Sequence, residues 1–156
     1  MRAHTARRNR RNDEAGFTII ELLVVTGVIA VLAAIAISAG YYAFDAARLG
    51  RSVADMRAIS ESIARYKLDY ATIPAGSLQP VSDISTTLEL VTRDVPTQDA
   101  WGHNYYYEEV TVSGVDTYRL YCYGKDGAYD GVISGNWVDF YSDTVVEGGY
   151  FIQTKY

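Results

Sequence analysis

The chain contains 156 residues with a mass of 17.3 kDa, and its 49% hydrophobic and 21% charged residues give the composition of one globular domain. Five of its 14 basic residues precede Phe17, so residues 17–156 hold nine bases and 17 acids, a net charge of −8. This acidic balance argues against a nucleic-acid partner. The single cysteine, Cys122, excludes an internal disulfide, and two histidines with one cysteine are too few for a zinc site.

The first predicted element is an apolar helix. Residues 17–40 form a run of 24 residues with one charge, Glu21, and no proline. At about 1.5 Å per residue this run is long enough for a hydrocarbon core of ~30 Å, so it indicates a membrane helix or a signal sequence. Arginines cluster before it and the acidic body follows, which predicts a cytoplasmic N-terminus and a body outside the cytoplasm.

Glu21 is the unusual residue of this run, because an ionisable side chain in an apolar helix is costly unless it is paired. No Lys or Arg lies between Glu14 and Arg48. Cleavage between Gly16 and Phe17 would create a new amine at Phe17, four residues or one helical turn from Glu21. That amine could neutralise the carboxylate within one chain or between neighbours.

The basic leader ending in Gly16, followed by Phe17, Thr18, Glu21 and the apolar run, resembles the class III signal of type IV pilins and pseudopilins. The resemblance implies cleavage after Gly16 by a prepilin peptidase, N-methylation of Phe17, and use of Phe17 and Glu21 in subunit assembly. Residues 1–16 would then be the leader and residues 17–40 the transmembrane and assembly helix.

Two alternatives stay open at this stage. Ala34-Ile35-Ala36 fits the small-x-small site of an ordinary secretory signal peptide, which would release a secreted, tyrosine-rich binding module. A single-span anchor that forms no filament is the other. The signal-peptide interpretation treats the spacing of Phe17 and Glu21 as accidental.

A second, amphipathic helical segment is predicted over residues 41–71. Its apolar residues recur at steps of three and four, namely Val53, Met56, Ile59, Ile63, Tyr66 and Tyr70. One helix from Phe17 to about Ala71 would be roughly 80 Å long. Half of it must therefore be covered by lipid or other subunits, while the other half packs on the body.

Residues 72–103 are predicted to form a connector with a short helix near 85–91, started by a capping box of Thr86 and Glu89. Residues 104–156 are predicted to form an antiparallel sheet. Period-two alternation indicates a hairpin with strands from about Asn104 and over Val115–Tyr123, and further strands over Trp137–Tyr141 and Gly149–Thr154. The predicted fold class is α+β, with one long helix on a small sheet, as in pilins.

Three strings refine the resemblance: Asp99–Tyr105, Gly124–Gly127 and Gly135–Trp137 are similar to elements of the major pseudopilin of type II secretion systems. In that family the corresponding loop binds calcium, which implies oxygen ligands from Asp126, Asp130 and Asn136. The family's acidic pair before the last string is absent here, where residues 132–134 stand instead. The alternative is a solvated loop of Asp-Gly turns.

The sequence contains no recognisable catalytic motif, so we do not expect an enzyme. His103 is predicted to be a turn residue and Cys122 a small buried hydrophobe. The 14 tyrosines could form a stacking surface for a ligand, but half-buried sheet faces also favour tyrosine, and we prefer the second interpretation.

These observations predict a structural subunit of a type II secretion pseudopilus, or alternatively the major subunit of a type IV pilus. The resemblance implies a filament of identical copies, minor pseudopilins, a prepilin peptidase, an inner-membrane assembly platform with its ATPase, and membrane lipid before assembly. The expected location is the inner membrane with the body in the periplasm, then the filament, which for a pilus reaches the cell surface.

Overall fold

A computed structural model describes residues 16–130 and 140–153 of the chain. The chain divides into two compact units, residues 1–40 and 41–156. One helix, α1 (Ile19–Tyr70), contributes to both, which confirms the prediction of a single element from the apolar run to about Ala71. The helix ends where Ala71 takes a left-handed backbone with φ 56° and Pro74 follows, because neither continues an α-helix.

In the first unit, the side chains of residues 19–39 are all exposed. An 18-residue stretch of α1 has a mean hydropathy of 2.7, and none of it is buried within the molecule. By length and composition this helix could therefore cross a membrane. A core helix of a soluble protein would be buried instead.

In the second unit, α1 buries one face. The buried residues follow the three- and four-residue steps of a helix face, namely Leu49, Ser52, Val53, Met56, Ile59, Ser60, Ser62 and Ile63. Of the apolar residues predicted for this face, Tyr66 is half-buried and Tyr70 is 49% exposed, because the face leaves the core near the end of the helix.

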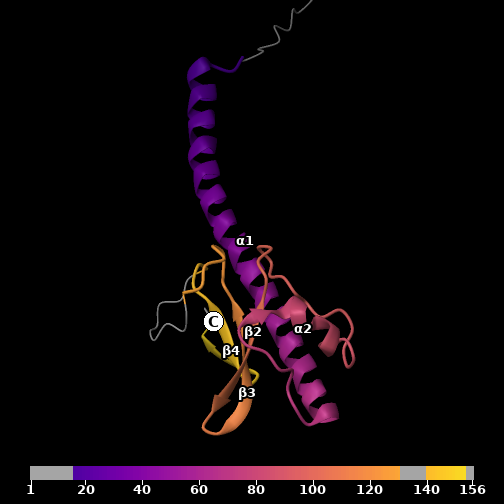
Figure 1. The fold of residues 1–156 in the computed structure, drawn as a ribbon. Helices are drawn as coiled ribbons and strands as arrows, with labels where there is room; N and C mark the ends of the chain where they lie inside the picture. Colours follow the sequence, from indigo (N-terminus) through magenta and orange to yellow (C-terminus); the bar gives the residue numbers. More distant parts are fainter. Residues whose placement is uncertain (1–15, 131–139, 154–156) are drawn as a thin grey trace, which may run out of the picture. The chain divides into compact units, whose positions relative to one another are not determined.

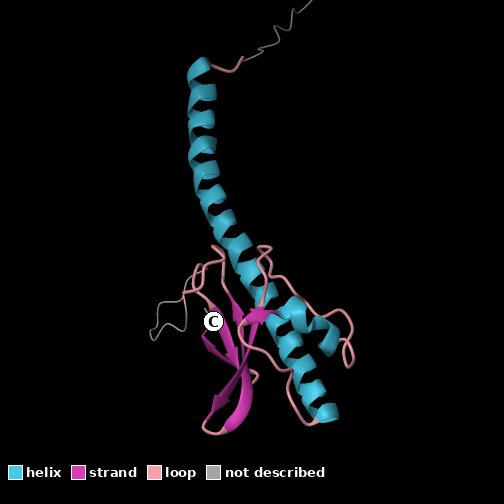
Figure 2. Cartoon of the chain, in the orientation of Figure 1, coloured by secondary structure: helices cyan, strands magenta, loops and turns pink. Residues whose placement is uncertain are grey.

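The body contains one antiparallel sheet of five strands, in which the spatial order follows the chain order (Figures 1 and 2). The strands are β1 (Gln79–Pro80), β2 (Tyr106–Val112), β3 (Val115–Cys122), β4 (Thr144–Glu147) and β5 (Tyr150–Gln153). A second helix, α2 (Val81–Leu88), follows β1 directly. The predicted α+β fold with a helix and a small sheet is confirmed.

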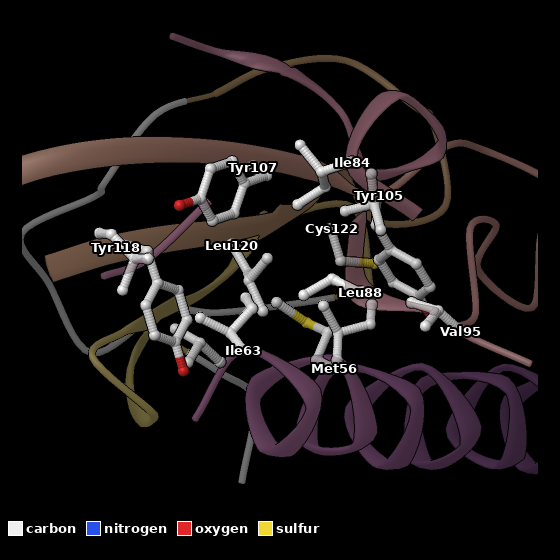
Figure 3. Close-up of a cluster of buried hydrophobic side chains, with 14 residues drawn as sticks. Met56, Ile63, Ile84, Leu88, Val95, Tyr105, Tyr107, Tyr118, Leu120 and Cys122 are labelled. Atoms are coloured by element: carbon white, nitrogen blue, oxygen red, sulfur yellow. The ribbon is translucent and has the colours of Figure 1, made fainter. Parts of the chain in front are cut away.

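The core lies between α1, α2 and one face of the sheet (Figure 3). Tyr107 and Leu120 are opposite each other in the β2–β3 register and both are fully buried. Tyr118 and Cys122 lie on the same face, as the period-two pattern predicts. Cys122 is a buried free cysteine, and burial raises the pKa of its thiol to about 12, so it packs as a small hydrophobe.

The connector contains a short helix, as predicted, but the predicted position and capping box were wrong. The short helix spans Val81–Leu88 rather than 85–91, and Thr86 with Glu89 forms no capping box. Pro80 precedes the helix as its N-cap residue, and its fixed φ suits that position, whereas Glu89 lies at the C-terminal cap. The strand β1 was not predicted because two residues give no periodic pattern.

The C-terminal strands differ in part from the prediction. The predicted strand over Trp137–Tyr141 is not found at Phe140 and Tyr141, and residues 137–139 lie outside the described residues. The fourth strand is β4 instead. The last predicted strand, Gly149–Thr154, agrees with β5 to within one residue at each end, although Thr154 lies outside the described residues. Residues 144–153 thus form a hairpin.

Candidate functional site

Gly16 and Phe17, the residues of the predicted cleavage site, lie just before α1, and the side chain of Phe17 is 83% exposed. Thr18 is the residue before the first helical residue. Its hydroxyl oxygen accepts a hydrogen bond from the Glu21 backbone amide at 3.2 Å, and the Glu21 carboxylate accepts bonds from the Thr18 amide at 3.5 Å and hydroxyl at 3.4 Å. These reciprocal bonds are a capping box.

Sequence analysis assigned a capping box to Thr86 and Glu89 but missed this one. The signal was present, because Thr18 and Glu21 have the T-x-x-E spacing immediately before an apolar run. The box has a consequence for Glu21. Its carboxylate lies at the positive end of the helix dipole and is already bound to the backbone of the first turn, which stabilises a charge on an otherwise apolar segment.

The predicted calcium residues lie on the segment after β3. The Asp126 carboxylate accepts a hydrogen bond from the Ala128 amide at 3.1 Å, and the Asp130 amide donates to the buried Asp143 carboxylate at 3.0 Å. Asn136 lies outside the described residues. Within residues 16–130 and 140–153, no three His, Cys, Asp or Glu side chains come together as a metal site.

Lys125 links this segment to α1 through an ion pair, a contact that the sequence did not predict. Its Nζ is 2.7 Å from an Asp45 carboxylate oxygen, and its amide donates to the Phe140 carbonyl at 2.8 Å. The hydrogen bond and charge of Lys125 lower the pKa of Asp45, and the same pair raises the pKa of Lys125. No sequence pattern signals the pair, since its members are 80 residues apart.

His103 contacts the same segment from another side. Its Nδ1 lies 3.0 Å from the Gly124 carbonyl oxygen, and its ring lies so close to Gly127 that a Cβ there would be 2.8 Å from Nε2. The buried Asp99 carboxylate accepts hydrogen bonds from the amides of Trp101 and His103, both at 2.9 Å. His103 is thus part of a tight turn, as predicted, and that turn supports residues 124–127.

The tyrosines of the sheet pack mainly against each other and the core. On the face away from the core cluster, Tyr106 stacks on Tyr123 with ring centroids 4.6 Å apart, and Tyr123 lies 5.4 Å from Tyr129. The Tyr121 hydroxyl donates to Glu108 at 2.8 Å. These contacts favour a packing role for the tyrosines over an open stacking surface.

The exposed apolar helix, its capped N-terminus and the antiparallel body together define a pilin-like subunit. The chain belongs to the family of type II secretion system protein G, which residues 41–138 match, and residues 11–37 match the prokaryotic N-terminal methylation motif. It is similar to the type II secretion system core protein G of Pseudomonas aeruginosa, with 29% identity over 143 residues, covering 82% of this chain and 98% of that protein. No solved structure matches the chain.

This family confirms the prediction of a pseudopilin, a core structural subunit of the type II secretion pseudopilus and not an enzyme. The alternatives of a type IV pilus subunit and of a secreted binding module are not favoured by these matches. The methylation motif contains Gly16, Phe17 and Glu21, and it implies a prepilin peptidase and other secretion-system components as partners. Membrane anchoring before incorporation into the pseudopilus is consistent with both matches and with the exposed helix.

Proposed function

We propose that the chain polymerises through residues 17–40 into a filament of identical copies whose growth pushes folded proteins out of the periplasm. The observation that carries this proposal is the exposed apolar half of α1, because such a surface is stable only in lipid or against other apolar helices. Lipid would cover it before assembly, and the same segment of neighbouring copies would cover it afterwards.

Glu21 would set the register between copies. After cleavage behind Gly16, the methylated amine of Phe17 would carry the only positive charge in residues 17–40, which hold no Lys or Arg. Pairing of this amine with the Glu21 carboxylate of a neighbour would remove two isolated charges from an apolar bundle. The capping box supports this role, since it fixes the carboxylate on the first turn of the helix.

The finer partners follow from the same scheme. A prepilin peptidase would process the chain at Gly16 and Phe17 while the body lies in the periplasm. An inner-membrane platform and its ATPase would extract the subunit from the membrane, and minor pseudopilins would be incorporated into the same filament.

The test combines the mature N-terminus with filament formation in cells. A chain that begins at N-methylated Phe17, with filaments that disappear in Glu21→Ala, is the expected result. Thr26→Ala is the matched control, since it changes a polar residue of the same apolar half and should leave filaments intact. A mature chain that begins after Ala36 would contradict the proposal, because the assembly helix would be removed.

We also propose that calcium binds the segment after β3 through Asp126, Asp130 and Asn136. The two described carboxylates fit this ion chemically, because both are exposed, and calcium prefers six to eight oxygen ligands. We expect millimolar calcium to raise the melting temperature of the protein, and Asp126→Asn and Asp130→Asn to abolish the increase. Asp83→Asn on α2 is the control. An unchanged melting temperature would contradict calcium binding.

A further inference from the structure

A groove of about 370 Å³ lies between the last turns of α1 and the β4–β5 turn. From α1 it is lined by Arg57, Ser60, Ala64 and Lys67, and from the sheet by Thr117 and Gly148. It is distinct from the N-terminal signal and from the proposed calcium segment. Neither the family match nor the proposed function assigns a role to it.

The groove is positively charged on an acidic body. Within the described residues, no carboxylate lies within ion-pair distance of Arg57 or Lys67, although Arg57 lies over the Phe151 ring at 5.4 Å. The one acid in the lining, Glu61, is neutralised by Arg65 at 2.7 Å. An incoming carboxylate would therefore meet the two cations Arg57 and Lys67, while the one acid of the lining is already paired.

The bottom of the groove contains an unsatisfied polar group. Ser60 is 9% exposed, and its hydroxyl has no hydrogen-bond partner among the described residues. A buried hydroxyl without a partner is unfavourable in the isolated subunit. Ile63 and Ala64 line the groove next to it. The chemistry fits a segment that combines an acidic with an aliphatic side chain.

The chain itself offers such segments. In the described part of the body, an exposed acid adjoins an exposed large apolar residue at four places, namely Leu68–Tyr70, Glu89–Leu90, Val115–Asp116 and Tyr129–Asp130. Leu68–Tyr70 directly follows Lys67 of the groove, and Val115–Asp116 lines a pocket that also contains Lys67. Both segments therefore belong to the same surface as the groove. Tyr129 is already packed on Tyr121 and Tyr123.

Glu89–Leu90 is the remaining segment. Leu90 is 66% exposed, and the turn is preformed, since the Glu89 amide donates to the Ser85 carbonyl at 2.8 Å and the Leu90 amide to the Thr87 carbonyl at 3.4 Å. Preformed segments lose little entropy on binding. α2 follows β1 at one edge of the sheet, whereas β4 and β5 lie toward the other edge, so the segment and the groove can face different neighbours (Figure 1).

We infer that the groove of one copy receives Glu89 and Leu90 of the next copy in the pseudopilus. Two different surfaces that fit each other form a head-to-tail contact, which propagates along a filament instead of closing into a dimer. Glu89 would approach Arg57 and Lys67, and Leu90 would cover the exposed side chain of Ala64. The inference rests on the proposed function, since it requires filaments.

Disulfide crosslinking of the full chain in filaments tests the contact. Cys122 is fully buried, so Ala64→Cys with Leu90→Cys introduces the only accessible thiols among the described residues. We expect a ladder of linked copies after oxidation. Ala54→Cys with Leu90→Cys is the matched control, because Ala54 is also exposed on α1 but does not line the groove. Dimers alone, links to another protein, or equal ladders from both pairs would overturn the inference.

Charge reversal provides the second measurement. In the Ala64→Cys and Leu90→Cys background, Lys67→Glu or Glu89→Lys should each reduce the ladder roughly twofold to fivefold, as for a partly exposed ion pair. The two reversals together should restore it. If filaments form but the double reversal restores nothing, the contact is wrong and the proposed function stands. If the unsubstituted chain forms no filaments, both are contradicted.

Discussion

The two halves of α1 have the same secondary structure but opposite surroundings. Residues 19–39 expose every side chain, whereas residues 41–70 bury a face that includes Met56, Ile59 and Ile63 at 0% exposure. The first half is apolar on all sides, and the second alternates apolar with charged residues. Helix formation therefore says little about the environment of a segment, whereas the distribution of polar residues around the helix decides it.

The largest expected difference between the halves is in alkaline solution. Burial raises the pKa of Cys122 and of Tyr123 to about 12, and it also raises the pKa of Tyr105, Tyr107 and Tyr121. The folded body holds these protons more tightly than the unfolded chain does. The contribution of these groups to the free energy of unfolding is therefore fully present below about pH 9 and is lost as pH rises toward 12. Each group contributes a slope of up to about 1.4 kcal/mol per pH unit.

We expect the body to lose its near-ultraviolet tyrosine signal between these pH values in detergent, while the apolar half stays helical. Residues 17–40 contain no Tyr, Cys, Lys or Arg, so this half has none of the buried protons that the body loses at alkaline pH. Cys122→Ala should reduce the slope of stability against pH. Unfolding of both halves at one pH would contradict the comparison.

Matched isoleucine truncations should separate the halves next. Ile59→Ala leaves a cavity in the core and should lower the free energy of unfolding of the full chain by about 2–5 kcal/mol. Ile29→Ala removes the same atoms from a side chain that is 59% exposed, so it should leave that free energy unchanged. Denaturant unfolding in detergent, followed by tyrosine fluorescence, measures both. Equal losses would show that the apolar half packs on the body.

The smallest expected effect concerns the start of the apolar half. Thr18→Ala removes the capping hydroxyl and should destabilise the first turn by about 0.5–2 kcal/mol, whereas Thr18→Ser should not. Because the Leu22 amide donates to the Thr18 carbonyl, its hydrogen exchange should become faster in detergent micelles. Unchanged exchange in Thr18→Ala would show that the hydroxyl does not cap the helix.

Sequence patterns predicted the parts of the fold that extend over several periods. The full helix and the β2–β3 hairpin were found this way, with Tyr118 and Leu120 on the correct face. The β4–β5 hairpin was not predicted as a pair of strands. Its signal was present, because Gly148-Gly149, with φ 57° and 91°, lies between the apolar residues Val145-Val146 and Phe151-Ile152, and Gly-Gly favours a two-residue hairpin turn.

The contacts around the candidate sites were less predictable. Phe17 and Glu21 are four residues apart and can be related by helix geometry alone. Asp45 and Lys125 are 80 residues apart, and their pairing depends on how the body folds. The N-terminal signal could therefore be recognised from the spacing of nearby residues. The groove and the contacts that support residues 124–127 depend on the tertiary structure and could not be predicted in this way.

The short strand β1 affects how bodies can be crowded together. It forms one edge of the sheet with only two residues, and Pro80 has no amide hydrogen to donate. Long open edges promote strand pairing between molecules and lead to aggregation. A strand this short, interrupted by proline, offers a second chain little to pair with, so this part of the sheet edge does not promote merging of sheets when many copies are held side by side at high local concentration.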